Sequence, residues 1–284
     1  MLRKAMWRWM FVAMMMAAGS SVSATADAEI IQFKSADVPP SPFKARMAAR
    51  QGKPAPLSVA GDVISADVAK PVGAGPFPAV ILFPAAGGWN DTPAHWPALL
   101  NTWGFITVKM LSMEPRGIRS PKRWHTRQAR PNVSVRDAVG AIRMLRTVSY
   151  ADASRVAIMG WSWGAAAALK SVEREGWMKR FGERPRAAVA FYPRCDGAAD
   201  YVSPSMILKG AKDEEASPAL CVGLIEGAPV GSELPELILY RGAHHRFDDP
   251  NAPDAVVGGI YRAFNPKAAA NAVTRIRAFF MKNL

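Results

Sequence analysis

Six short hydrophobic runs recur along the chain, and most of them are continuous rather than alternating. They lie at 78–84, 105–111, 155–159, 187–192, 205–209 and 236–240. A continuous apolar run of this length is typical of a strand that is buried on both faces of a sheet. The segments between the runs show helical spacing, most clearly where Val135, Val139 and Ile142 fall on one face. Strands that alternate with helices predict an α/β fold with a mostly parallel central sheet and helices on both faces.

The start of the chain has the pattern of a secretory signal peptide. Arg3, Lys4 and Arg8 precede an apolar run at 9–18, and small residues typical of a cleavage site follow it. Residues 1–28 are therefore predicted to direct export to the periplasm or the cell exterior. The alternative is an uncleaved anchor, but the run is short for a bilayer span. Because no later stretch is long and apolar enough, no stable membrane insertion is expected after the signal is removed.

The remainder is predicted to form an arm followed by one domain. Residues 29–56 are polar and rich in proline, which predicts a mostly irregular arm with one short strand at Glu29–Phe33. Residues 57–69 alternate loosely between apolar and polar positions, as expected for one or two antiparallel edge strands. No repeat or low-complexity linker divides the rest, so residues 57–284 are expected to fold as a single domain.

The stretch Gly160-x-Ser162-x-Gly164 has the clearest chemical signal. A β-branched apolar run precedes it and an alanine-rich segment follows it, so the serine is predicted to lie on a sharp strand-to-helix turn. That context is the nucleophile elbow of the α/β-hydrolase fold, in which glycines relieve crowding and the helix N-terminus favours developing negative charge. The alternative is an ordinary turn whose serine caps the helix.

A serine hydroxyl needs a base to become nucleophilic, and in this fold the chain order is serine, acid, histidine. Two of the four histidines follow Ser162, and both His244 and His245 lie just after the last predicted strand. Only one of these neighbours is expected to reach the serine, because successive side chains point in different directions.

The acid that orients the histidine is predicted to be Asp213, which follows a strand through a short turn. The carboxyl ends of parallel strands line the sites of open α/β sheets. Asp196 and Asp200, which follow the preceding strand, are the alternative acids. Glu214 and Glu215 are expected to be solvated acids at a helix start.

The tetrahedral intermediate of acyl transfer needs hydrogen-bond donors for its oxyanion. One is expected from the backbone N–H of Trp163, directly after the serine. Another is expected from Ala85 or Ala86 in the loop after the strand at 78–84, and Ala86 is preferred. Tryptophans in these loops either line an apolar pocket or pack in the core: Trp89, Trp124, Trp161 and Trp163.

Several further motifs follow one another in a recognisable order. They are Ala86-Gly87-Gly88-Trp89, Pro115-Arg116-Gly117, Gly160-Trp161-Ser162-Trp163-Gly164, Phe191-Tyr192-Pro193-x-Cys195, Gly210-x-x-Asp213, Gly242-Ala243-x-His245-x-Phe247 and Phe264-Asn265-Pro266. From about residue 57 to its end, the chain resembles the dienelactone hydrolase family of α/β-hydrolases, particularly its exported members. The resemblance implies that His245 is the catalytic histidine.

The chain departs from that family pattern at two points. Ser162 stands where the name-giving enzymes have a cysteine nucleophile, which argues against dienelactone itself as the substrate. Pro84-Ala85 replaces a His-Gly pair that is often found after the same strand in the family, and this replacement affects the loop expected to supply an oxyanion donor.

The composition excludes several classes of partner. The chain has 36 basic and 23 acidic residues, a net charge of +13, but no nucleic-acid-binding motif, so this excess is interpreted as a solvated surface feature and no nucleic acid is expected to bind. The dense basic stretch at 116–130 is either a solvated loop or a surface that faces an anionic substrate group. No spacing of ligating residues suggests a metal, and no phosphate-binding loop is present, so neither a metal nor a cofactor is predicted.

Cys195 and Cys221 are the only cysteines in the chain. Because disulfides persist in oxidising compartments, the two are predicted to form one bridge in an exported protein. The loop-entropy relation gives this bridge a stabilising contribution of about 3 kcal/mol. The alternative is two separate buried thiols.

Together these features predict a serine hydrolase that cleaves a small-molecule ester or lactone. Ser162 would attack the carbonyl, His245 would shuttle the proton and Asp213 would orient the imidazole. Two other interpretations share the same features: a non-catalytic binding protein on a hydrolase scaffold, and a peptidase or acyltransferase with the same triad. The sequence leaves the substrate and the oligomeric state open.

Overall fold

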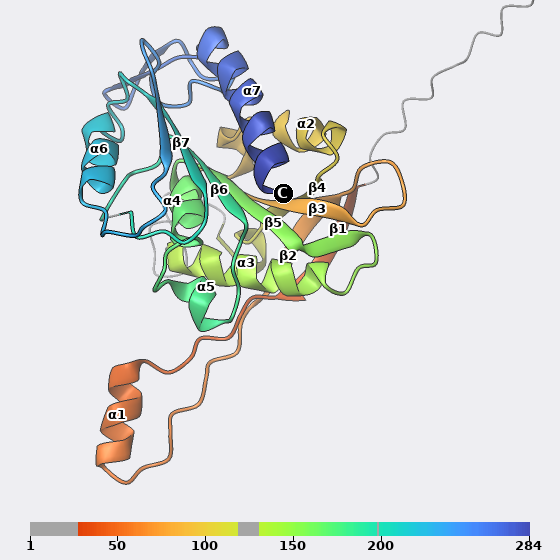
Figure 1. The fold of residues 1–284 in the computed structure, drawn as a ribbon, viewed down its shortest axis with the longest axis vertical. Coiled ribbons are helices and arrows are strands. Elements are labelled where there is room, and N and C mark those ends of the chain that lie inside the picture. The colour runs from red at the N-terminus through yellow and green to blue at the C-terminus, as the bar shows by residue number, and fades with distance from the viewer. Residues whose placement is uncertain (1–27, 119–130, 198) are drawn as a thin grey trace, which may run out of the picture.

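An eight-stranded sheet forms the centre of the computed structural model, which describes residues 28–118, 131–197 and 199–284 (Figure 1). Its strand order is β1-β2-β4-β3-β5-β6-β7-β8. The strands are β1 (Ala28–Lys34), β2 (Val63–Ala69), β3 (Phe77–Phe83), β4 (Ile106–Leu111), β5 (Ala151–Trp161), β6 (Ala187–Phe191), β7 (Ser205–Gly210) and β8 (Glu236–Tyr240). β2 pairs antiparallel with β1 and β4, whereas the pairings from β4 to β8 are parallel. The mostly parallel sheet predicted from the sequence is confirmed.

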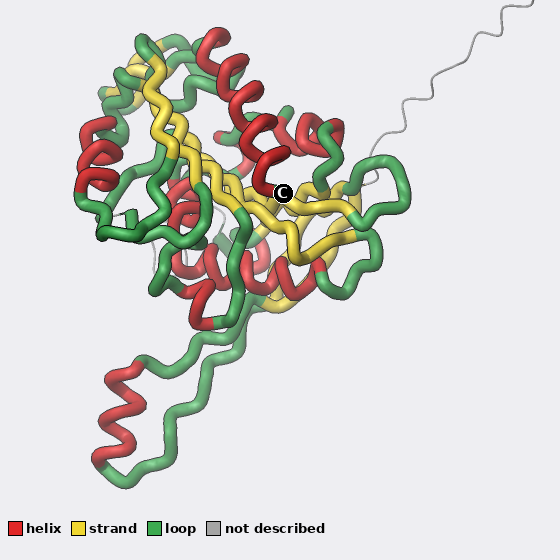
Figure 2. Tube along the Cα trace, viewed as in Figure 1, coloured by secondary structure: helices red, strands yellow, loops and turns green. Residues whose placement is uncertain are grey.

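Helices cover both faces of this sheet, and Figure 2 shows the strands lying between them. The helices are α1 (Pro42–Arg50), α2 (Trp96–Thr102), α3 (Pro131–Leu145), α4 (Trp163–Lys170), α5 (Trp177–Arg180), α6 (Pro218–Glu226) and α7 (Pro266–Asn283), with short 3-10 turns at Trp89–Asp91 and Glu114–Arg116. Adjacent residues of a strand point to opposite faces. Ile81 therefore packs in a core with α3, α4 and α6, whereas Leu82 packs in a second core with α2 and α7. The apolar runs are continuous because both faces of the strands are buried.

The segment predicted to be an irregular arm contains more regular structure than its composition indicates. The short strand expected at Glu29–Phe33 is present as β1. β2 is antiparallel as expected but is second from the edge of the sheet, because β1 pairs outside it. Helix α1 was not expected; it begins after Ser41, whose hydroxyl accepts a hydrogen bond from the backbone N–H of Lys44. No residue of α1 is buried, and the helix stands away from the sheet (Figure 1).

A small hairpin follows β8. The sequence-based prediction that β8 is the last strand is therefore wrong. The hairpin consists of β9 (Ala255–Val257) and β10 (Ile260–Arg262), which pair antiparallel. Gly258 and Gly259 join them with φ angles of 63° and 84°, a left-handed conformation that favours glycine. The hairpin reaches the region of His245, which forms an isolated bridge with Arg262.

Some sequence-based predictions lie outside the described residues. These include nearly all of the predicted signal peptide and most of the basic stretch at 116–130, with Trp124 in it. No helix in the described part of the chain combines the length and the hydrophobicity of a bilayer span.

Candidate active site

Ser162 lies on a sharp turn between β5 and α4, with φ 50° and ψ −106°, a backbone conformation that non-glycine residues rarely adopt. The two flanking glycines are required by space. A Cβ on Gly160 would lie 2.2 Å from the carbonyl oxygen of Gly164, and a Cβ on Gly164 would lie 2.3 Å from that of Phe83. The side chain of Ser162 makes no capping hydrogen bond to α4. The alternative in which this serine caps the helix is therefore wrong.

A chain of hydrogen bonds links Ser162, His245 and Asp213. Oγ of Ser162 lies 3.1 Å from Nε2 of His245, and Nδ1 of His245 lies 2.9 Å from Oδ2 of Asp213. The three residues follow β5, β8 and β7 respectively, at the carboxyl ends of these parallel strands. When Nδ1 donates its proton to the carboxylate, Nε2 is left to accept the proton of the serine hydroxyl.

Donors on both oxygens hold Asp213 as an anion. Oδ1 accepts hydrogen bonds from the backbone N–H groups of Glu215 and Ala216, each at 3.0 Å. Oδ2 accepts one from His245 and one from the ammonium of Lys209, the latter at 2.7 Å. Burial alone would raise the pKa of this carboxyl, but the hydrogen bonds and charges of His245 and Lys209 outweigh burial and hold the pKa below its ordinary value.

A close backbone contact brings the acid and histidine loops together. Gly210 ends β7, and a Cβ at this position would lie 2.5 Å from the carbonyl oxygen of Ala243. The same carbonyl accepts a hydrogen bond from the backbone N–H of Lys212 at 2.9 Å. A glycine at 210 therefore allows the loop before His245 to lie against the loop before Asp213.

The structure separates the other candidates from this cluster. His244 turns its ring toward Tyr261, with the two ring centroids 4.7 Å apart. Asp196 and Asp200 each form an ion pair with an arginine near the surface. Of the residues considered as base or acid, His245 contacts Ser162, and Asp213 contacts His245.

The two predicted oxyanion donors lie after β3 and at the start of α4. The N–H of Ala85 donates to Oγ1 of Thr92 at 3.0 Å, which leaves Ala86 as the candidate after β3. The side chains of Ala86 and Trp163 both pack against Ile118. Trp163 is the first residue of α4 and lies at the positive end of the helix dipole.

A cavity of about 330 Å³ lies beside Ala86. Its wall is mostly apolar and includes Phe83, Trp89, Met110, Met113 and Ile118. The hydroxyl of Ser112, which also lines the cavity, is buried without a hydrogen-bond partner in the described part of the chain. Of the two roles expected for the loop tryptophans, Trp89 therefore has that of lining an apolar pocket.

A buried polar network that the sequence did not reveal supports the histidine loop. Oδ2 of Asp248 accepts hydrogen bonds from the indole N–H groups of Trp96 at 3.2 Å and Trp161 at 3.0 Å, and Oδ1 accepts one from the hydroxyl of Tyr192 at 2.9 Å. The ring of Tyr192 lies 4.5 Å from that of His245. Burial raises the pKa of Asp248 to about 6, although the three donors act in the opposite direction. Trp161 is therefore a core residue with a polar anchor.

Two charged side chains near the site form specific ion pairs. Glu215 is exposed, as expected for a solvated acid, and its Oε2 lies 2.6 Å from Nη2 of Arg262 and 3.9 Å from Nε2 of His245. Arg116, the first residue of the basic stretch, makes two hydrogen bonds with Asp137 at 2.8 Å each, and its side chain is only 5% exposed. Arg116 is therefore occupied in a buried ion pair and does not face a substrate.

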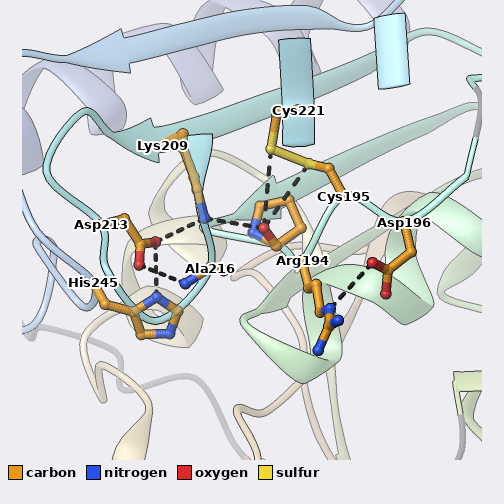
Figure 3. Close-up of a disulfide and its surroundings, with 9 residues drawn as sticks. Arg194, Cys195, Asp196, Lys209, Asp213, Ala216, Cys221 and His245 are labelled. Carbon is orange, nitrogen blue, oxygen red and sulfur yellow. Dashed lines mark hydrogen bonds and ion pairs between the residues drawn. A yellow bond between two sulfur atoms is a disulfide. The ribbon is translucent and has the colours of Figure 1, made fainter. Parts of the chain in front are cut away.

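Cys195 and Cys221 form a disulfide, which joins the loop after β6 to α6 (Figure 3). Both residues are buried, with their Cα atoms 4.8 Å apart. Helix α6 begins shortly after Asp213 in the chain, so the bridge fixes the far end of the loop that contains this acid.

The sequence profile of the Dienelactone hydrolase family matches residues 64–284. This chain belongs to the dienelactone hydrolase family. It is therefore a hydrolase, and the family resemblance noted in its motifs is confirmed over most of the chain. A comparison with curated proteins finds no match.

Solved structures share the fold of this dienelactone hydrolase family member at low sequence identity. A proposed dienelactone hydrolase from Klebsiella pneumoniae is 18% identical, with a TM-score of 0.61 over 89% of this chain and 99% of that one. A dienelactone hydrolase-like promiscuous phosphotriesterase from metagenomic libraries is 19% identical, with a TM-score of 0.62 over 91% and 99%. Esterase 2 of Thermogutta terrifontis is 16% identical, with a TM-score of 0.51 over 77% and 88%. These similarities confirm the predicted α/β-hydrolase fold.

Proposed function

We propose that this hydrolase is a serine esterase that cleaves a small-molecule ester or lactone through Ser162, His245 and Asp213. The supporting observation is the continuous hydrogen-bond chain from Oγ of Ser162, through both ring nitrogens of His245, to Oδ2 of Asp213. A serine hydroxyl is a weak nucleophile at neutral pH. A base within hydrogen-bond reach, itself oriented by a carboxylate, activates it.

In the proposed reaction, Oγ of Ser162 attacks the substrate carbonyl carbon while Nε2 of His245 takes the hydroxyl proton. Asp213 stabilises the imidazolium and does not itself become protonated. The carbonyl oxygen becomes an oxyanion, which the backbone N–H groups of Trp163 and Ala86 stabilise. The imidazolium then protonates the departing alkoxide. Water, activated by His245 in the same way, hydrolyses the acyl-enzyme and restores the serine.

The cavity beside Ala86 supports a compact substrate with an apolar acyl part. Its volume of about 330 Å³ is at the lower end of the range for small-molecule pockets, and its wall is largely aliphatic and aromatic. The disulfide between Cys195 and Cys221 supports a further part of the proposal, that the protein works after export, because such bridges persist in oxidising compartments.

Hydrolysis of short-chain nitrophenyl esters by the wild type and by Ser162→Ala tests this function. The matched control is Ser205→Ala, which removes a buried hydroxyl without a described partner from β7. Ser162→Ala is expected to lower the rate by at least about 10³-fold, and Ser205→Ala is expected to leave it unchanged. Equal rates for the wild type and Ser162→Ala would overturn the proposal.

The same assay separates the proposed esterase from the alternatives. A folded wild-type protein that turns over no ester or lactone would support a non-catalytic binding protein. A protein that cleaves peptide substrates at higher kcat/KM than esters would support a peptidase with the same three residues.

A further inference from the structure

Lys209 is a fully buried lysine near the end of β7, where it interrupts an otherwise apolar strand. Its side chain and that of Asp213 are both 0% exposed. Transfer of an ammonium from water into a protein interior is strongly unfavourable unless hydrogen bonds and an opposite charge compensate for it. The contacts of this ammonium therefore determine whether the lysine can be held in place.

Two oxygens accept hydrogen bonds from Nζ of Lys209 (Figure 3). Oδ2 of Asp213 lies 2.7 Å away, and the carbonyl oxygen of Pro193 lies 3.1 Å away. The sulfur atoms of Cys195 and Cys221 lie 3.9 and 4.0 Å from that same carbonyl oxygen. Lys209 thus connects the segment that is fixed by the disulfide with the acid beside His245.

The ammonium and the imidazole share one oxygen atom. Nζ of Lys209 is 2.7 Å and Nδ1 of His245 is 2.9 Å from Oδ2 of Asp213. The two nitrogens therefore lie within about 6 Å of each other, a separation at which one charge shifts the pKa of another group. A conventional arrangement of serine, histidine and acid has no such cation on the acid.

We propose that Lys209 is a positioning residue of the triad: its ammonium fixes the Asp213 carboxylate against His245, offsets part of the carboxylate charge, and so sets the pH range over which ester hydrolysis is fast. This inference rests on the function proposed above.

The other ionisable groups around His245 are all retained when Lys209 is replaced. Glu215, from the loop after β7, lies 3.9 Å from Nε2 and is paired with Arg262 of β10. Tyr192 directly follows β6; its ring centroid lies 4.5 Å from that of the imidazole, with the rings tilted by 57°, and its hydroxyl donates to Asp248. None of these groups donates a side-chain hydrogen bond to the acid within the described residues.

Loss of the Lys209 ammonium leaves the negative charge of Asp213 less compensated. Without Lys209, the buried carboxylate of Asp213 keeps His245 as its only cationic side-chain partner in the described part of the chain. Removal of this positive charge favours the protonated imidazole, so kcat/KM is expected to reach its plateau at a higher pH. A purely structural lysine would affect stability and leave this pH unchanged.

The test is the pH profile of kcat/KM for a nitrophenyl ester, from about pH 5 to pH 9, in the wild type, Lys209→Met and Lys212→Met. Lys212 is an exposed lysine in the same loop, so it controls for the loss of one positive charge. The acid limb of Lys209→Met is expected to move upward by about one pH unit, with a plateau that falls by about tenfold. Lys212→Met is expected to follow the wild type.

A folded Lys209→Met protein whose acid limb coincides with that of the wild type would overturn the inference and leave the proposed function intact. Circular dichroism and thermal unfolding establish whether each variant is folded. If the methionine variant does not fold, Lys209→Gln provides the same neutral comparison, and Lys209→Arg, which keeps the charge, is expected to keep the wild-type acid limb. A wild type that hydrolyses no ester would overturn the proposed function and this inference together.

Discussion

The hydroxyl of Tyr192 donates a hydrogen bond to Asp248 over 2.9 Å and thereby ties the end of β6 to the segment that follows His245. Tyr192 has a φ of 39°, in the left-handed region, and its ring packs against the imidazole. A buried carboxylate with three neutral donors thus anchors the loop that presents the histidine. The position of His245 is fixed from two sides, by Asp213 and by this aromatic network.

Asp248→Asn is expected to remove a pH-dependent penalty on folding. The fold raises the pKa of Asp248 from 3.8 to about 6, so the folded state binds its proton more tightly than the unfolded chain. Its contribution to the free energy of unfolding is therefore greatest below about pH 4 and falls as the pH rises through 6, by roughly 3 kcal/mol in total.

Urea unfolding at about pH 4 and pH 7 measures this effect. Between these two pH values, the wild type is expected to lose stability relative to Asp248→Asn. A constant difference between the two proteins over that interval would show that Asp248 does not titrate in this way.

Gly164→Ala is expected to destabilise the protein by at least about 2 kcal/mol and to abolish ester hydrolysis. The added Cβ would lie 2.3 Å from the carbonyl oxygen of Phe83, so the turn that contains Ser162 must shift. Gly223→Ala in α6 is the matched control, because a Cβ there meets nothing within 4 Å. That control is expected to gain about 0.5–1 kcal/mol from better helix propensity. Thermal unfolding with the ester assay measures both, and equal behaviour of the two variants would contradict the steric argument.

Replacement of both Cys195 and Cys221 by serine is expected to lower the free energy of unfolding by about 3 kcal/mol. The bridge spans a sequence separation of 26 residues and restricts the unfolded chain. Denaturant unfolding with and without a thiol reductant measures the effect. The reductant is expected to destabilise the wild type and to leave the double variant unchanged. A wild type that is insensitive to complete reduction would contradict a stabilising role for the bridge.

The sequence indicates the site because its chemistry is concentrated at strand ends. The glycines around Ser162 report a tight turn directly, and Asp213 and His245 follow apolar runs that predict parallel strands. The choice between His244 and His245 needs a family motif, because nothing local distinguishes adjacent histidines in a loop.

The parts that the sequence does not indicate are buried contacts between distant residues. Asp248 and Trp161 are 87 positions apart, and no local pattern predicts that one accepts a hydrogen bond from the other. Lys209 does leave a signal, a lysine within an apolar strand, but its partners become visible only in the fold. Helix α1 is missed for a different reason: it is nine residues long, it packs no residue in the core, and it lies in a polar, proline-rich segment whose composition favours irregular structure.

Labelling with a fluorophosphonate probe, followed by mass spectrometry of the modified peptide, is the most direct test of the proposed triad. The adjacent histidines supply a matched pair of variants, His244→Ala and His245→Ala. The wild type and His244→Ala are expected to be labelled on Ser162 at similar rates, and His245→Ala at least about 10³-fold more slowly. Modification at another residue, or equal labelling rates in the two histidine variants, would contradict activation of Ser162 by His245.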